Sequence, residues 1–160
     1  MSQKLPPKEY YESLARVPTS GAAIIRNEKG EFLIQKQTYK DDWHLSGGMS
    51  DLNETPREAA IREVKEELDI TIDNPRLFCV DFDTRDPFVR ILFVFDAGIL
   101  SDDAINKIRS DPDEIAEYKF VSAEEMLKLL APKLSKRMQS SFEAFEKGLC
   151  VYLENGERVD

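Results

Sequence analysis

The chain has 160 residues, of which 41% are hydrophobic, and this is the size of one domain with its own core. It carries 22 basic and 31 acidic side chains, which gives a formal net charge of −9. A chain this acidic is not a general nucleic-acid binder, because it has no basic excess to displace the counterions of a phosphate backbone. If its substrate is anionic, a divalent cation is one device that would hold it.

The sequence shows no feature of secretion or membrane insertion. Residues 1–17 form a polar lead-in without the apolar core of a signal peptide, and no apolar run approaches the roughly 20 residues of a membrane span. Cys79 and Cys150 have neither metal-ligand nor redox spacing. We therefore expect one soluble, cytoplasmic domain over residues 1–160 that has no membrane partner. A homodimer is left open.

Apolar periodicity and turn residues predict strands that alternate with helices. Strands are predicted at residues 21–25, 31–36, 43–45, 76–82, 88–97, 117–121 and 150–153, with a loop at 46–48. Helices are predicted at residues 56–68, 101–110, 122–130 and 134–147, with a short one near 10–16. Because the order is not strictly βαβ, we expect an α/β fold with a mixed central sheet covered by helices on both faces.

The helix predicted at residues 56–68 has the strongest boundary signals in the chain. Thr55 is a good N-cap, Pro56 suits the first helical position, and Glu58 completes a capping box with Thr55. A glycine-containing segment, Gly47-Gly48 and the residues after it, leads directly into this helix. Glycine permits close backbone approach, so such a segment can direct backbone groups at an ion or a phosphate.

Three glutamates share one face of this helix. Glu63, Glu66 and Glu67 have the spacing i, i+3 and i+4, which places neighbouring Cβ atoms about 5–6 Å apart. Like charges at this spacing repel, so something must offset them. One interpretation is a solvated face on which Arg62 pairs with a glutamate. The other is a divalent-cation site, since hard cations such as Mg²⁺ bind carboxylate oxygens together with substrate phosphates.

The segment from Gly48 to Ile70 resembles the Nudix box, and the prediction of function rests on this resemblance. That motif is Gly, five residues, Glu, seven residues, Arg-Glu, an aliphatic, any residue, Glu-Glu, any residue, Gly and an aliphatic. Every defined position matches except that Asp69 replaces the last Gly. That position ends the helix, at a positive φ that Asp tolerates better than most residues.

The resemblance implies a Nudix-type α/β/α sandwich with the box at residues 47–70. It also implies hydrolysis of a phosphoanhydride bond in a nucleoside diphosphate linked to another moiety, with Mg²⁺, or in its place Mn²⁺, as cofactor. Transferred to this chain, Glu63 and Glu67 ligate metal, Glu66 is a further ligand or the base, and the carbonyl of Gly48 completes the ligands. Arg62 and Glu54 pair and orient the ligands. In a later loop, Glu114 is a second candidate for the base.

The partner implied is a small nucleotide-type molecule. The candidates are Trp43, Arg26, Lys36 and Arg90, which suit base stacking or phosphate and ribose contacts. His44 suits a structural or substrate-lining position better than general-base catalysis. Two other functions compete: a non-catalytic Nudix-fold sensor of a nucleotide metabolite, and an isomerase on the same fold. The sequence does not identify the nucleoside diphosphate derivative.

Overall fold

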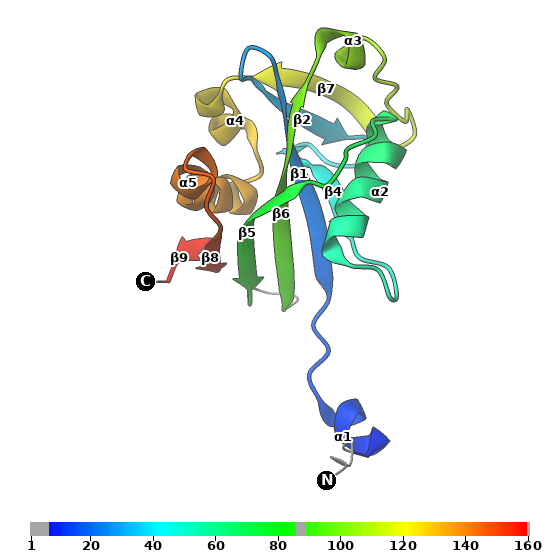
Figure 1. Cartoon of the computed structure of the whole chain (residues 1–160), viewed down its shortest axis with the longest axis vertical. Coiled ribbons are helices and arrows are strands. Elements are labelled where there is room, and N and C mark those ends of the chain that lie inside the picture. The colour runs from blue at the N-terminus through cyan, green and yellow to red at the C-terminus, as the bar shows by residue number, and fades with distance from the viewer. Residues whose placement is uncertain (1–6, 86–88, 160) are drawn as a thin grey trace.

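A mixed β-sheet forms the centre of the molecule (Figure 1). The structure is a computed structural model that describes residues 7–85 and 89–159. Its main path is β3-β2-β1-β6-β5-β8-β9, while β4 pairs with β1 and β7 pairs with β2. The β1–β6 and β5–β8 pairs are parallel and the others are antiparallel. The strands are β1 (Thr19–Asn27), β2 (Phe32–Gln37), β3 (Trp43–His44), β4 (Ser46–Met49), β5 (Arg76–Asp83), β6 (Arg90–Leu100), β7 (Ile115–Val121), β8 (Val151–Glu154) and β9 (Glu157–Arg158).

Helices cover both faces of this sheet, so the predicted sandwich with a mixed sheet is confirmed. Figure 1 shows α2 (Pro56–Leu68) on one side, and α4 (Ala123–Leu129) and α5 (Pro132–Glu146) on the other. The short α3 (Asp102–Ile105) follows β6, and α1 (Lys8–Ser13) lies away from the sheet near the N-terminal end. Within the described ranges, no helix is long and apolar enough to cross a membrane.

The core is divided by the sheet into two apolar clusters. Adjacent strand residues point to opposite faces, so Ile24 belongs to the cluster under α4 and α5, and Ile25 belongs to the cluster under α2. The same alternation in β2 sends Ile34 to the first cluster and Leu33 to the second. This burial on both faces explains why the strand sequences are almost continuously apolar.

Local signals fix the position of α2. Thr55 and Glu58 form the predicted capping box, in which each accepts a hydrogen bond from the other's backbone N–H, at 3.2 and 2.9 Å. The helix ends at Asp69, whose φ of 55° is left-handed, as the sequence predicts for this position. Val64 and Leu68 are fully buried against the sheet, which orients the opposite and lateral faces of the helix outward.

The main error of the sequence-based assignment is at residues 46–48, predicted as a loop but found as strand β4. The strand pairs antiparallel with β1, and Gly47 lies opposite Ala22. A Cβ on Gly47 would lie 2.4 Å from the carbonyl oxygen of Gly21, so the glycine permits close strand approach here and does not indicate a loop. The helix predicted at 101–110 is also shorter than expected, at Asp102–Ile105, and the Phe88 end of the strand predicted at 88–97 lies outside the described residues.

Candidate functional site

Arg62 organises the acidic face of α2. Its guanidinium donates hydrogen bonds to Glu54 at 2.8 and 3.0 Å, to Glu63 at 2.8 Å and to Glu66 at 2.9 Å. It also donates to the carbonyl oxygen of Met49 in β4, at 3.1 Å. These contacts raise the pKa of Arg62 and lower that of Glu54, mainly through the hydrogen bond between the two side chains. Arg62 therefore links the helix to the chain that precedes it, and we call Arg62, Glu54, Glu63, Glu66 and Glu67 the carboxylate network.

Glu67 lies deeper than its neighbours on the helix. The residue is 1% exposed, and its carboxylate accepts hydrogen bonds from the Ser46 hydroxyl and from the backbone N–H of Gly47, at 3.1 Å. Burial raises the pKa of Glu67, although the bond from Ser46 acts in the opposite direction. The side chain is thus held against β4.

Gly48 leaves room for Glu63 at the same strand. A Cβ at position 48 would lie 2.2 Å from Glu63 Oε1, so any larger residue would displace this carboxylate. Burial raises the pKa of Glu63, the hydrogen bond from Arg62 opposes this, and the negative charges of Glu66 and Glu114 add to the rise. The influence of Glu114 shows that its carboxylate lies within electrostatic reach of the helix.

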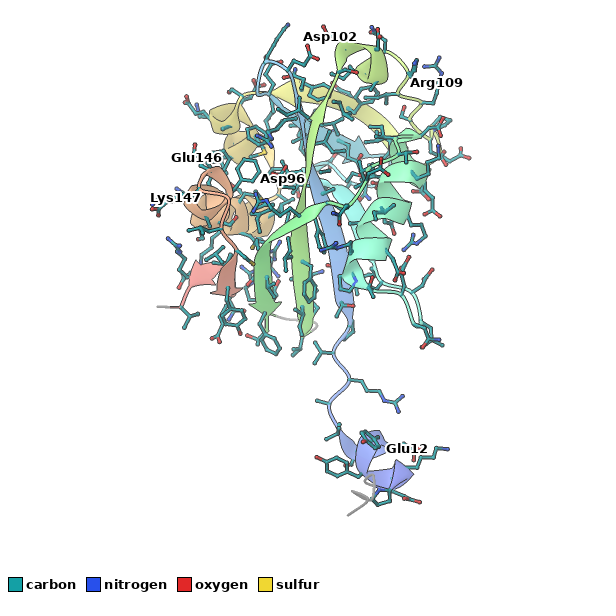
Figure 2. The ribbon with its side chains drawn as sticks, in the orientation of Figure 1. Glu12, Asp96, Asp102, Arg109, Glu146 and Lys147 are labelled. Atoms are coloured by element: carbon teal, nitrogen blue, oxygen red, sulfur yellow. The ribbon has the colours of Figure 1, made fainter. Side chains whose placement is uncertain are left out.

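The segment that carries Glu114 is attached to the end of α2. The backbone N–H of Arg109 donates to the carbonyl of Leu68, and that of Asp111 donates to the carbonyl of Glu67. Arg109 accordingly lies beside the end of the helix in Figure 2. Thr38, just after β2, donates its backbone N–H to the carbonyl of Glu114 at 2.8 Å. These bonds explain how Glu114, 47 positions beyond Glu67 in the numbering, comes close to the carboxylate network.

The carboxylates of the carboxylate network are suitable ligands for a divalent cation, but in this structure they accept hydrogen bonds from protein groups. Across residues 7–85 and 89–159, no three His, Cys, Asp or Glu side chains are arranged to hold a metal ion. In this structure Glu63 and Glu66 accept hydrogen bonds from Arg62, while Glu67 accepts them from β4. The residues nevertheless fit a hard cation, because all their donors are carboxylate oxygens and burial with like charge raises the pKa of Glu63.

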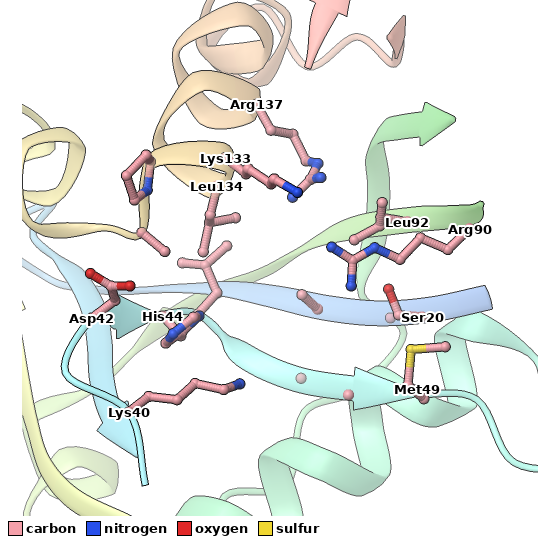
Figure 3. A pocket seen from close by; sticks show the side chains of 17 residues that line it. Ser20, Lys40, Asp42, His44, Met49, Arg90, Leu92, Lys133, Leu134 and Arg137 are labelled. Atoms are coloured by element: carbon pink, nitrogen blue, oxygen red, sulfur yellow. The ribbon is translucent and has the colours of Figure 1, made fainter. Parts of the chain in front are cut away.

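A cavity of about 620 Å³ begins at Gly47 and Gly48 and extends under α5 (Figure 3). Its apolar lining includes Ala22, Leu92 and Leu134. The charged and imidazole side chains that line it are Lys40, Asp42, His44, Arg90, Lys133 and Arg137. Burial, reinforced by the charge of Lys40, lowers the pKa of His44, which favours the neutral imidazole.

The four predicted substrate-binding side chains lie in different places. Arg90 lines this cavity. Arg26 pairs with Asp96 and lies 4.9 Å from the Phe145 ring, in a second cavity under α5; Figure 2 shows Asp96 on that side of the sheet.

The other two are engaged elsewhere. Lys36 lines a third cavity, which includes Tyr39, and pairs with Asp41. The Trp43 ring packs against the apolar cluster under α4 and α5, with the Lys119 ammonium 4.6 Å from its centre.

Sequence reasoning missed a buried charge cluster at the α5 end of the first cavity. Arg137 is 4% exposed and donates to Asp81 at 2.7 Å, and it lies 3.8 Å from Asp83. Arg85 and Arg90 also pair with Asp83, at 2.7 and 3.6 Å. We call Asp81, Asp83, Arg85, Arg90 and Arg137 the guanidinium network.

Two signals in the sequence point to this cluster. Asp81 and Asp83 alternate within a strongly apolar strand, on one face of it. Arg137 lies next to Met138 and four residues before Ser141, on the buried side of an amphipathic helix. Charges at such positions require partners, because an isolated buried charge is strongly unfavourable.

Comparison with known proteins gives a consistent family. The model of the NUDIX domain matches residues 16–145. An uncharacterised Nudix hydrolase of Listeria innocua is 37% identical over 114 residues, which is 64% of this chain and 62% of that protein. The chain thus matches less than two thirds of that relative's length.

Solved structures show the same fold. The MutT protein of Methanosarcina mazei Go1 has a TM-score of 0.67 and 29% identity, over 85% of this chain and 98% of that one. A C. elegans Ap4A hydrolase binary complex has a TM-score of 0.62 and 22% identity, over 83% of this chain and all of that one. The second likeness, at this identity, concerns the fold alone.

Proposed function

Because the chain belongs to the Nudix family, we propose that it is a metal-dependent hydrolase that cleaves a phosphoanhydride bond in a nucleoside diphosphate linked to another moiety. The observation that carries this proposal is the position of Glu63 of the carboxylate network beside Gly48, a residue that lines one end of the cavity. A diphosphate at that end would meet the helix glutamates, while the group attached to it would extend under α5.

Mg²⁺ or Mn²⁺ would be held by Glu63, Glu66 and Glu67, with the carbonyl of Gly48 as a further donor. The chemistry supplied by a bound divalent ion is charge neutralisation of the diphosphate and activation of water for in-line attack on phosphorus. It also resolves the electrostatic difficulty of a −9 chain that binds an anionic substrate.

The residues of the chain itself prepare this reaction. Arg62 holds Glu63 and Glu66 on the same side of the helix through one guanidinium group, and its bond to Glu54 fixes the guanidinium in turn. Such supporting contacts orient metal ligands and tune their basicity. Ser46 and Gly47 do the same for Glu67.

Three carboxylates are candidates for the base that takes the proton from water. Glu66 and Glu63 belong to the helix, and Glu114 approaches from the loop bound to its C-terminal end. A base in that loop would leave the helix glutamates to the metal ion. The partner is a small nucleotide-type molecule, with Arg90 as the cation of the predicted set that lines the cavity.

Formation of nucleoside monophosphate from a panel of nucleoside diphosphate derivatives, with and without Mg²⁺, tests the function. We expect turnover of at least one compound with Mg²⁺ or Mn²⁺, and its complete loss in excess EDTA. Turnover that persists in EDTA would exclude the metal-dependent mechanism. Saturable binding of a nucleotide without turnover would instead support a sensor, and rearrangement of the substrate without cleavage of the diphosphate would support an isomerase.

A further inference from the structure

The cavity beneath α5 is basic although the chain as a whole is acidic. Arg137 and Lys133 reach into it from α5, Arg90 from β6, and Lys40 from the segment before β3, whereas Asp42 is the acidic side chain among its described lining residues (Figure 3). In a chain with a net charge of −9, this is a local reversal of sign. A concave site lined by one sign of charge concentrates ligands of the other sign.

Arg137 supplies a second and independent indication of a ligand. Its side chain is 5% exposed, and its Nε donates to Asp81 at 2.7 Å. Its Nη2 is buried and has no hydrogen-bond partner in the described part of the chain, since the contact with Asp83 is an ion pair at 3.8 Å. Buried donors are rarely left unsatisfied, and those that are call for an explanation such as a ligand.

The charge ratio of the guanidinium network explains why this donor remains available. Three guanidinium groups share two carboxylates, and Arg85 already occupies both oxygens of Asp83, at 2.7 and 3.1 Å. Asp81 accepts from the backbone N–H of Gly156 with its other oxygen. The carboxylates therefore position Arg137 and Arg90 without saturating them, and an oxyanion in the cavity would complete the set.

The described lining residues also bear on whether the cavity could bind a nucleobase by stacking. No Phe, Tyr or Trp belongs to the described residues that line the cavity, so they offer no aromatic surface on which a nucleobase would stack. The Nε2 atom of His44 is buried and also lacks a hydrogen-bond partner within residues 7–85 and 89–159. The polar groups of this cavity are thus suited to oxygen-rich, charged groups.

We propose that this cavity is a subsite for a second anionic group, a carboxylate or phosphate carried by the substrate in addition to its scissile diphosphate. This inference rests on the proposed hydrolase function and narrows its substrate class. One end of the substrate places the diphosphate at Gly48 and the carboxylate network, and the other places the second anion against Arg137, Arg90 and Lys133.

Matched substrate pairs test the subsite with the Mg²⁺-loaded enzyme. UDP-glucuronate and UDP-glucose differ by one carboxylate, and ADP-ribose 2′-phosphate and ADP-ribose differ by one phosphate. We expect kcat/KM to favour the anionic member by about tenfold or more in at least one pair, as one charge-assisted contact provides. The pair that shows the preference identifies the anion as carboxylate or phosphate.

Three variants connect this preference to the cavity. Lys133→Gln removes a charge at the cavity rim, and Arg137→Lys keeps the charge but removes the forked donor. Both should reduce the anionic-to-neutral ratio of kcat/KM about tenfold. Lys128→Gln is the matched control, because Lys128 is an exposed lysine of α4 that pairs with Glu124, and it should leave the ratio unchanged. If Arg137→Lys does not fold, Lys133→Gln alone decides.

A binding measurement separates failure of the subsite from failure of the hydrolase function. Inorganic phosphate and glucuronate are titrated in EDTA against the labelled protein, with NMR detection of the Arg137 Nε–H and the Leu134 amide. Shifts at these groups, weakened in Lys133→Gln, support the subsite even if no diphosphate is hydrolysed.

The opposite results overturn it. If diphosphates are hydrolysed but neither pair shows a preference, or if no shift occurs at these groups, the subsite is rejected while the hydrolase function stands or falls on its own assay.

Discussion

The carboxylate network and the guanidinium network are built on opposite charge ratios. In the first, the guanidinium group of Arg62 donates hydrogen bonds to three carboxylates on and before α2. In the second, two carboxylates form ion pairs with three guanidinium groups between β5, β6 and α5. Each network is left with unbalanced charge, which is negative around Arg62 and positive around Asp81 and Asp83. A cation and an anion are the ligands that would balance them.

The two networks also differ in solvent exposure. Glu66 is 56% exposed in its side chain, whereas Arg137 is 5% exposed and Asp81 is fully buried. Exposed ion pairs contribute little to stability, but removal of one partner of a buried pair leaves an uncompensated charge. Mutation of the exposed Glu66 should therefore affect activity, and mutation of the buried Arg137 should affect folding as well.

The largest effect is expected from the charge of the helix glutamates. Glu63→Gln, Glu66→Gln and Glu67→Gln keep side-chain size, and at least one should lower kcat by on the order of 10²–10⁴, as removal of a base or ligand does. Circular dichroism should show the fold retained. Glu124→Gln, on the exposed face of α4, is the control. Near-wild-type turnover in all three would mean that the acidic face is only solvated.

The second network should respond through stability. Arg137→Met leaves Asp81 buried without its cation and should lower the free energy of unfolding by about 3–5 kcal/mol in urea denaturation. Lys136→Met on the same helix breaks an exposed pair with Glu157 and should cost less than about 1 kcal/mol. Equal losses in the two variants would contradict the distinction between buried and exposed networks.

A third effect concerns Glu114, whose negative charge contributes to the raised pKa of Glu63. As the base, Glu114→Gln should lower kcat by about 10² with little change in KM or in the Mg²⁺ requirement. As a distal metal ligand, it should instead raise the Mg²⁺ concentration for half-maximal rate. A variant that changes neither quantity would return the base to Glu66 or Glu63.

The smallest effect is on the free energy of unfolding at acidic pH. Burial opposes the charge of Asp83, but its contacts with Arg85 and the charge of Arg90 lower its pKa from 3.8 to about 2. Because the folded pKa is the lower one, the stabilisation is present above pH 3.8 and is lost as the pH falls toward 2. Between about pH 5 and pH 2, wild type should lose about 2 kcal/mol more than Asp83→Asn in urea titrations. Parallel acid profiles would disprove this assignment.

Local sequence signals predicted α2 and the relation between its charges. The capping box follows from residues close in sequence, which is why its position could be derived. The left-handed Asp69 and the pairing of Arg62 with Glu54 were implied by the resemblance to the Nudix box. The burial of Glu67 could not be derived in this way, because it depends on Ser46 and Gly47 of a strand that had been assigned as loop.

Long-range features were harder to predict for a physical reason. The sequence places Lys36 at the end of one predicted strand and Arg26 directly after another, but it does not show which face of the sheet each one meets or which acid it pairs with. Arg26 is held by Asp96, 70 residues further along the chain. The buried pairing of Arg137 could not be predicted, because its partner lies 56 residues away, in β5. Strand alternation and helix amphipathicity predict which face of an element a side chain occupies. Only the fold shows which residue that side chain contacts.

The parallel pairing of β1 with β6 has a consequence for the chain during its synthesis. Ile24 lies opposite Asp96, so one edge of an apolar central strand is without a partner until some 70 further residues have been made. At about 5–20 residues per second, this is a delay of roughly 4–14 seconds. Unpaired apolar edges are templates for aggregation, so fragments that end before Arg90 should associate in light-scattering assays, whereas the full chain should not. The nascent chain therefore depends on the prompt arrival of its second half.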